Sequence, residues 1–117
     1  MRDFKKLEVW KLAHALSLDV FRSCGREFSR FPGLRAQTLR AVQSIGSNIA
    51  EGSGSEGAEF LRFLGHSLRS TLEVENDLIL SRDLGVLRQR DFDRLNERVD
   101  HVRRKLISFM RFLRGQE

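Results

Sequence analysis

The sequence predicts an all-α fold, an antiparallel up-down four-helix bundle that forms a single domain of 117 residues. Three observations support this prediction. Apolar residues recur at helical spacing in four stretches, and no stretch alternates apolar and polar residues as a strand does. The chain has one proline, so long stretches are free to be helical. Hydrophobic residues make up 40% of the chain, which is enough for one core.

The first helix is expected over residues 7–24. Trp10, Val20 and Cys24 fall on the same apolar side of this stretch. Gly25 follows, and glycine suits the left-handed conformation that is common after a helix end. We interpret Trp10 as a core residue rather than a stacking platform for a base, and Cys24 as an inert buried thiol.

The second helix is expected over residues 34–50, because Pro32 disfavours helical conformation at the residue before it. Gly46 lies inside this helix and should weaken or bend it. Opposite the apolar side is a small polar face, which suggests close approach by a further copy of the chain. An ordinary solvated face is the alternative. The candidate interface residues are Gln37, Arg40, Ser44, Ser47, Asn48 and Glu51.

The third helix is expected over residues 56–84, ended by Gly85. In the glycine- and serine-rich link before it, Ser53 or Ser55 is the expected helix cap. Glu73, Glu75 and Asp77 form an acidic cluster in the helix. No histidine has the spacing from glutamate that di-iron bundles use, so we expect ion pairs with Arg40 or another arginine, and neither a metal nor a cofactor.

The fourth helix is expected over residues 91–113, where apolar residues alternate steps of three and four in a heptad typical of bundle packing. Arg94, Arg98 and Lys105 flank this apolar seam and are the best candidates for contacts with phosphates. The alternative is that these side chains cover apolar edges and pair with acids. Lys11 and Arg40 complete the candidate nucleic-acid-binding set.

The chain has a formal net charge of +5 and a pI of about 10.3, which favours polyanionic partners. Residues 1–30 and 86–117 are basic, whereas residues 56–85 are acidic. Either antiparallel helices balance these charges, or the first and last helices build a basic face. No apolar run is long enough to cross a bilayer, no signal peptide is visible, and a lone cysteine forms no internal disulfide, so we expect a cytoplasmic protein without membrane contacts.

The stretch from Arg40 to Gly52 resembles the signature of a bacterial family of small four-helix-bundle proteins. Some members of this family are encoded in intervening sequences of large-subunit ribosomal RNA genes. The most specific part is Ser44-Ile45 followed by residues 47–52. Further matches lie at Phe4, residues 7–13, Phe31-Pro32, Gly33-Leu34, Gln37, Phe60, Phe63-Leu64, Ser70, Glu73 and Leu84-Gly85. The chain departs from the family at Gly46, where proline is usual, and at Leu39, where a second arginine is frequent.

This resemblance implies a fold and an assembly more than an activity. Family members are similar to subunits of ring-like homo-oligomers, with five copies as the favoured number. A related bundle is the accessory variability protein of diversity-generating retroelements, a basic pentamer that engages nucleic acid and a reverse transcriptase. The resemblance supplies no catalytic residues.

Two functions are therefore considered. The first is a non-enzymatic, oligomeric nucleic-acid-binding protein that favours RNA and contacts phosphates through a basic surface. The alternative is a structural or adaptor module that self-assembles and binds a protein partner such as a reverse transcriptase. We do not expect an enzyme, because the sequence shows no arrangement of Ser, His and Asp, no Cys–His pair and no metal-ligand spacing that would support catalysis.

Overall fold

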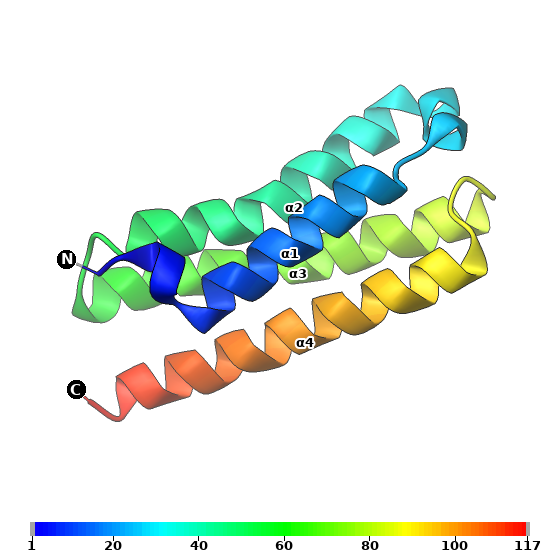
Figure 1. Cartoon of the computed structure of the whole chain (residues 1–117). Helices are drawn as coiled ribbons and strands as arrows, with labels where there is room; N and C mark the ends of the chain where they lie inside the picture. Colours follow the sequence, from blue (N-terminus) through cyan, green and yellow to red (C-terminus); the bar gives the residue numbers. More distant parts are fainter. Residues whose placement is uncertain (1, 117) are drawn as a thin grey trace.

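The computed structural model describes residues 2–116. Its four long helices are Glu8–Ser23 (α1), Pro32–Gly52 (α2), Gly57–Asp83 (α3) and Gln89–Arg114 (α4). The short 3-10 helix Phe4–Lys6 (η1) precedes α1, and a second one, Arg26–Arg30 (η2), lies between α1 and α2. Each helix packs against the next along the chain, and α4 closes the bundle against α1 (Figure 1). The predicted all-α four-helix bundle is confirmed, and the described residues contain no strand.

The molecule is a rod of about 47 × 20 × 20 Å. Both chain ends and the α2–α3 turn lie at one end of this rod, whereas η2 and the α3–α4 turn lie at the other (Figure 1). The core runs along the rod between the apolar sides of the four helices. Its largest fully buried side chains include Leu16, Val20, Ile45, Phe60, Leu64, Leu95 and Leu106. Each contributes about 1.5–3 kcal/mol through removal from water.

Trp10 is half-buried at the edge of this core rather than inside it. Its ring stacks on that of His14 at 4.8 Å between centroids, and Phe4 meets it edge-on at 5.1 Å. On α2 it faces Gly46, where an added Cβ would lie 3.7 Å from the Trp10 Nε1 atom. The helix α2 is continuous through Gly46.

The second helix begins at Pro32, two residues before its expected start. Proline suits the first position of a helix, because its missing N–H is one that the helix would leave unpaired. The helix ends at Gly52, which packs closely against two phenylalanines of α3. A Cβ at this position would lie 2.6 Å from the Phe63 Cβ and 2.9 Å from the Phe60 Cδ1, so only glycine fits without a shift.

The prediction that Ser53 or Ser55 caps α3 is wrong. The residue before α3 is Glu56, and its side chain makes no capping hydrogen bond. The Ser53 hydroxyl instead donates to the Ala50 carbonyl at 2.6 Å, so it completes the preceding helix. The glycine expected to end α3 does adopt the left-handed conformation, with φ of 79° at Gly85.

No helix within residues 2–116 combines the length and the apolar character needed to span a membrane.

Candidate nucleic-acid interface

The predicted basic stripe on α4 is built into the contact between α4 and α1. The Arg94 guanidinium donates to both carboxylate oxygens of Asp19 on α1, at 3.0 and 3.1 Å, and to Asp91 Oδ1 at 2.7 Å. It also donates to the Ser23 hydroxyl at 2.8 Å. These contacts lower the pKa of the Asp19 carboxyl, chiefly through the hydrogen bonds from Arg94, and raise the pKa of Arg94.

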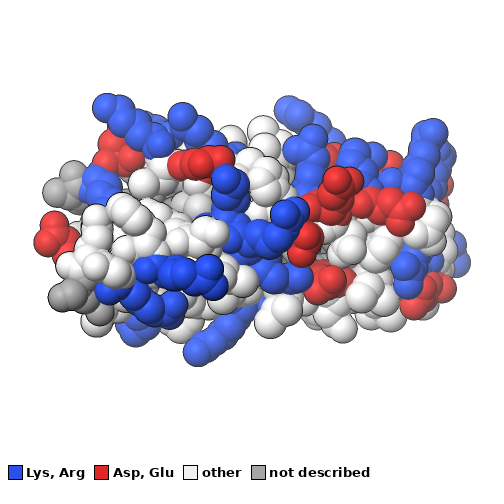
Figure 2. All heavy atoms as spheres, turned by 90° about the horizontal axis from the view of Figure 1, so that it is seen from below, with Lys and Arg blue, Asp and Glu red and all other residues white. Residues whose placement is uncertain are grey.

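The other two residues of the stripe also meet carboxylates of α1. The Arg98 Nε lies 3.1 Å from Asp19 Oδ2, and the Lys105 Nζ lies 3.5 Å from Glu8 Oε1. Two explanations were considered for the charge distribution along the chain. For these three residues the first applies: opposite charges on antiparallel helices balance each other. Such half-exposed pairs contribute about 0–1 kcal/mol each, and the carboxylate beside each cation offsets part of its positive charge. On the face shown in Figure 2, Asp and Glu side chains accompany the Lys and Arg side chains mainly in the right half of the view.

The other two candidates, Lys11 on α1 and Arg40 on α2, are exposed. Within residues 2–116 neither has a carboxylate oxygen within 4.0 Å. Of the five predicted residues, three therefore pair with carboxylates of α1, whereas Lys11 and Arg40 have no such partner among the described residues.

A different group of arginines gathers at the end of the rod that carries η2. We call this group the arginine tip; it consists of Arg22, Arg26, Arg30, Arg35, Arg88 and Arg90. In the part of the chain that the structure describes, none of the six has a carboxylate oxygen within 4.0 Å. Five are exposed and Arg35 is half-buried. Their charges are therefore available to a ligand.

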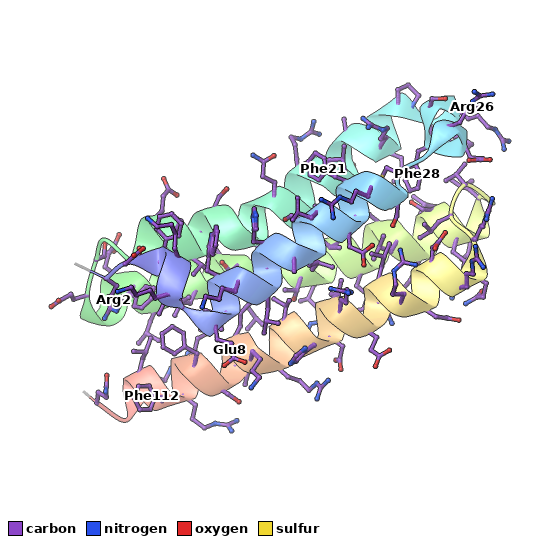
Figure 3. The ribbon with its side chains drawn as sticks, viewed as in Figure 1. Arg2, Glu8, Phe21, Arg26, Phe28 and Phe112 are labelled. Carbon is purple, nitrogen blue, oxygen red and sulfur yellow. The ribbon has the colours of Figure 1, made fainter. Side chains whose placement is uncertain are left out.

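The fold explains why η2 presents its arginines outward. The Phe28 side chain, in the middle of this five-residue helix, is fully buried and fixes η2 against the bundle. Arg26 and Arg30, two residues to either side, are left exposed. Figure 3 shows Arg26 at the end of the rod, with Phe28 on the side of η2 that faces the other helices.

A hollow of about 550 Å³ lies between the end of α1 and the α3–α4 turn. Arg22 and Arg88 of the arginine tip line it, together with Arg94. Three acids also line it: Asp19 and Asp91, which Arg94 engages, and Glu27, which makes no ion pair among the described residues. The hollow therefore offers two unpaired guanidinium groups beside one free carboxylate.

Sequence reasoning missed the arginine tip because its members come from three separate segments. They lie in the last turn of α1, in η2 with the start of α2, and around the start of α4. None of these segments forms a stripe at helical spacing. The available signal was the excess of arginine on both sides of Pro32, together with Arg88 and Arg90 just before the expected fourth helix.

The structure divides the predicted polar face of α2 into two sets. Three residues bond within the chain: the Ser44 hydroxyl contacts that of Ser70 on α3, Gln37 Nε2 donates to Asp77 Oδ1 at 2.7 Å, and Asn48 Nδ2 donates to the Ser44 carbonyl at 2.8 Å. The other three residues point outward: Arg40, Ser47 and Glu51.

The acidic cluster of α3 also divides. Glu75 pairs with Arg103 of α4 at 3.0 Å, which fits the expected role in ion pairing, although the partner is not Arg40. Asp77 is fully buried and bonds to Gln37, and Glu73 is exposed.

Residues 2–116 contain no group of three or more His, Cys, Asp or Glu side chains that could hold a metal ion. Cys24 is half-buried, and this burial raises the pKa of its thiol, as expected for an unreactive cysteine.

Comparison with known proteins settles the family. Residues 5–108 match the family described as 23S rRNA-intervening sequence protein. The chain belongs to this family. The resemblance predicted from the stretch between Arg40 and Gly52 is therefore confirmed.

The fold of this 23S rRNA-intervening sequence protein family member also occurs in a solved structure. A protein with unknown function from the S23 ribosomal protein family of Bacteroides thetaiotaomicron is similar with a TM-score of 0.78, over 87% of this chain and 97% of that chain. The two sequences are 21% identical, so the similarity shows the shared fold alone. No curated protein matches the chain.

Proposed function

We propose that this family member is a non-enzymatic RNA-binding protein of the cytoplasm that contacts phosphates through the arginine tip. The observation that carries the proposal is the group of six arginines at one end of the rod, none of which pairs with a carboxylate of residues 2–116. Guanidinium groups bind phosphates with paired, charge-assisted hydrogen bonds, and exposed cations on a surface attract a polyanion from a distance. Membership of a family named for ribosomal RNA genes makes RNA the nucleic acid to test first.

The paired residues of α4 have a different role in this proposal. Arg94 and Arg98 share Asp19 and hold α4 to α1, so they contribute to folding more than to phosphate contacts. Lys11 and Arg40 remain predicted phosphate contacts, because both are exposed and unpaired among the described residues.

Fluorescence anisotropy with a labelled RNA hairpin tests the proposal. Binding by the unaltered protein should weaken steeply between about 50 and 200 mM salt, because bound cations release counterions from the phosphates. The double variant Arg26→Ala/Arg30→Ala should reduce the slope of log K against log salt by about two. The matched control is Arg62→Ala/Arg104→Ala, which removes two exposed arginines that already pair with Glu59 and Asp100.

Two results would count against the proposal. One is the absence of binding to the hairpin at about 50 mM salt, where phosphate contacts are strongest. The other is an equal loss in the double variant and in the control, since total charge rather than the arginine tip would then be responsible.

We further propose self-assembly through the outward-facing residues of α2. Arg40 and Glu51 carry opposite charges on either side of the small Ser47, so two copies can approach closely and pair these charges. Five copies is the number that the family resemblance favours. Binding of a protein partner such as a reverse transcriptase through the same face is the alternative hypothesis.

Light scattering of Ser47→Arg tests this assembly. The variant should have a lower mass than the unaltered protein while circular dichroism shows the same helical content. Ser44 is unsuitable for this test, because its hydroxyl contacts Ser70 inside the chain and a bulky group there would disturb the bundle itself. Ala58→Arg, which alters an exposed residue of α3, should leave the mass unchanged. An unchanged mass for Ser47→Arg would exclude this interface.

A further inference from the structure

Phe112 lies near the end of α4, at the opposite end of the rod from the arginine tip (Figure 3). Its side chain is 60% exposed, more than that of any other large apolar residue described. A single exposed phenylalanine needs no special explanation. The surroundings of this one, however, favour a particular ligand.

The last turns of α4 are basic. Arg111 and Arg114 flank Phe112, and residues 101–116 include no Asp or Glu. Within residues 2–116 neither arginine has a carboxylate oxygen within 4.0 Å. The exposed ring therefore lies on a surface that attracts anions.

The same turns border a shallow, largely open depression of about 470 Å³. The residues that line it supply an aromatic face, a guanidinium, a hydroxyl and a side-chain amide. They are Ser108, Arg111, Phe112, Gly115 and Gln116. Two further hollows adjoin it: one of about 320 Å³ shares Ser108, and one of about 250 Å³ shares Gln116. Three depressions thus lie next to one another around the last turns of α4.

We infer that Phe112 is a stacking platform for an unpaired nucleobase of a single-stranded RNA segment. Arg111 binds an adjoining phosphate, and Ser108 and Gln116 offer hydrogen-bonding groups to the base edge. Aromatic rings beside arginine are the usual means of holding single strands, because every base has a π-face and each nucleotide carries a phosphate. This inference rests on the proposed function, which it deepens by naming the form of RNA that this second site takes.

Charge argues for RNA rather than a two-fold contact with a second copy of the chain at this surface. Such a contact would bring Arg111 of one copy against Arg111 of the other. Like charges opposed in this way are unfavourable, whereas a phosphate backbone is complementary to this arginine.

The experiment compares two labelled RNAs and three substitutions of Phe112. The probes are a ten-nucleotide oligoadenylate and an RNA duplex with the same number of phosphates. Phe112→Ala should weaken oligoadenylate binding about tenfold, the size expected for loss of one stacked base, and leave duplex binding unchanged. Phe112→Trp should keep the affinity, whereas Phe112→Leu, which retains apolar bulk without a π-face, should lose it. Leu72→Ala, which removes another apolar side chain that is 56% exposed, should leave the affinity unchanged.

Each contrary result has a distinct meaning. Unchanged oligoadenylate binding by Phe112→Ala, with duplex binding intact, would overturn the stacking site and leave the arginine tip standing. Full binding by Phe112→Leu would overturn stacking in favour of general apolar contact. A lower mass of Phe112→Ala by light scattering would make Phe112 part of a protein interface and also overturn the inference. Failure of the unaltered protein to bind either RNA would remove the proposed function together with this site.

Discussion

Replacing Asp77 by asparagine should stabilise the protein at neutral pH. Asp77 on α3 is fully buried, and its Oδ1 accepts a hydrogen bond from Gln37 at 2.7 Å. Its Oδ2 is buried without a hydrogen-bond partner, and the described residues provide no cation within 4.0 Å of the carboxylate. Asparagine has nearly the same shape and keeps the oxygen that Gln37 needs, but it carries no charge.

The pH dependence follows from the direction of the pKa shift. Desolvation raises the pKa of the Asp77 carboxyl, while the hydrogen bond from Gln37 and the neighbouring Asn76 side chain act in the opposite direction. A folded-state pKa above the unfolded value of about 3.9 means that the neutral form favours folding. The stability that Asp77 contributes is therefore fully present below the unfolded pKa and is lost as pH rises through the folded pKa.

The expected gain is the cost of burying the carboxylate charge without a cationic partner, which the neutral asparagine amide removes, about 1–2 kcal/mol. For a domain of this length, 1 kcal/mol corresponds to a change in Tm of about 4 °C. Asp77→Asn should therefore raise Tm by about 4–8 °C at pH 7.5, and this gain should shrink towards pH 4. Urea unfolding at several pH values, followed by circular dichroism, measures the free-energy difference directly.

The control is Asp93→Asn, because Asp93 also accepts a hydrogen bond from a glutamine, Gln89, at 2.8 Å, but on the exposed surface of α4. Its effect should stay within about 0.5 kcal/mol at every pH. Lower stability of Asp77→Asn at pH 7.5, or a gain that does not change with pH, would refute the argument that burial of this charge is unfavourable.

Two further pairs of substitutions, each a test and its control, probe the contacts that α2 and α4 make with α3. Gly52→Ala should destabilise the bundle by about 1–3 kcal/mol, because the new Cβ would overlap Phe63, whereas Gly65→Ala, with nothing within 4 Å of its Cβ, should stabilise it by up to about 1 kcal/mol. Equal Tm values for these two variants would contradict this account. Arg103→Met should cost about 1–3 kcal/mol in urea unfolding, because Arg103 donates three hydrogen bonds to α3. Arg104→Met, which removes an exposed ion pair, should change stability by less than about 1 kcal/mol, and a larger loss there than at Arg103 would reverse the expected order.

The sequence was sufficient for the fold and the family. Four amphipathic stretches with short links leave little choice but a bundle, and the stretch between Arg40 and Gly52 is specific enough to indicate the family. The ends of elements were harder to predict, because they depend on local geometry. Pro32 can either precede a helix or begin it, and Ser53 can cap the next helix or complete the last one.

The candidate interface depended on contacts that periodicity does not reveal. Arg94 and Asp19 are separated by 75 positions in the chain, so only the packing of α4 on α1 shows that this arginine is neutralised. The arginines without a carboxylate partner in residues 2–116 can be recognised only when the ion pairs of the folded chain are known. Trp10 lies at the edge of the core, beside Gly46 of α2. The residue pattern of α1 alone does not show which residue of another helix Trp10 contacts.

The buried ring of Phe28 has a consequence for recognition. The turn that carries Arg26 and Arg30 cannot swing away from the bundle without exposing this phenyl group, at a cost of about 1.5–3 kcal/mol. A ligand that arrives at this end of the rod meets a backbone that is already ordered. The entropy lost on binding is then confined to the arginine side chains themselves, which leaves more of the contact energy for affinity.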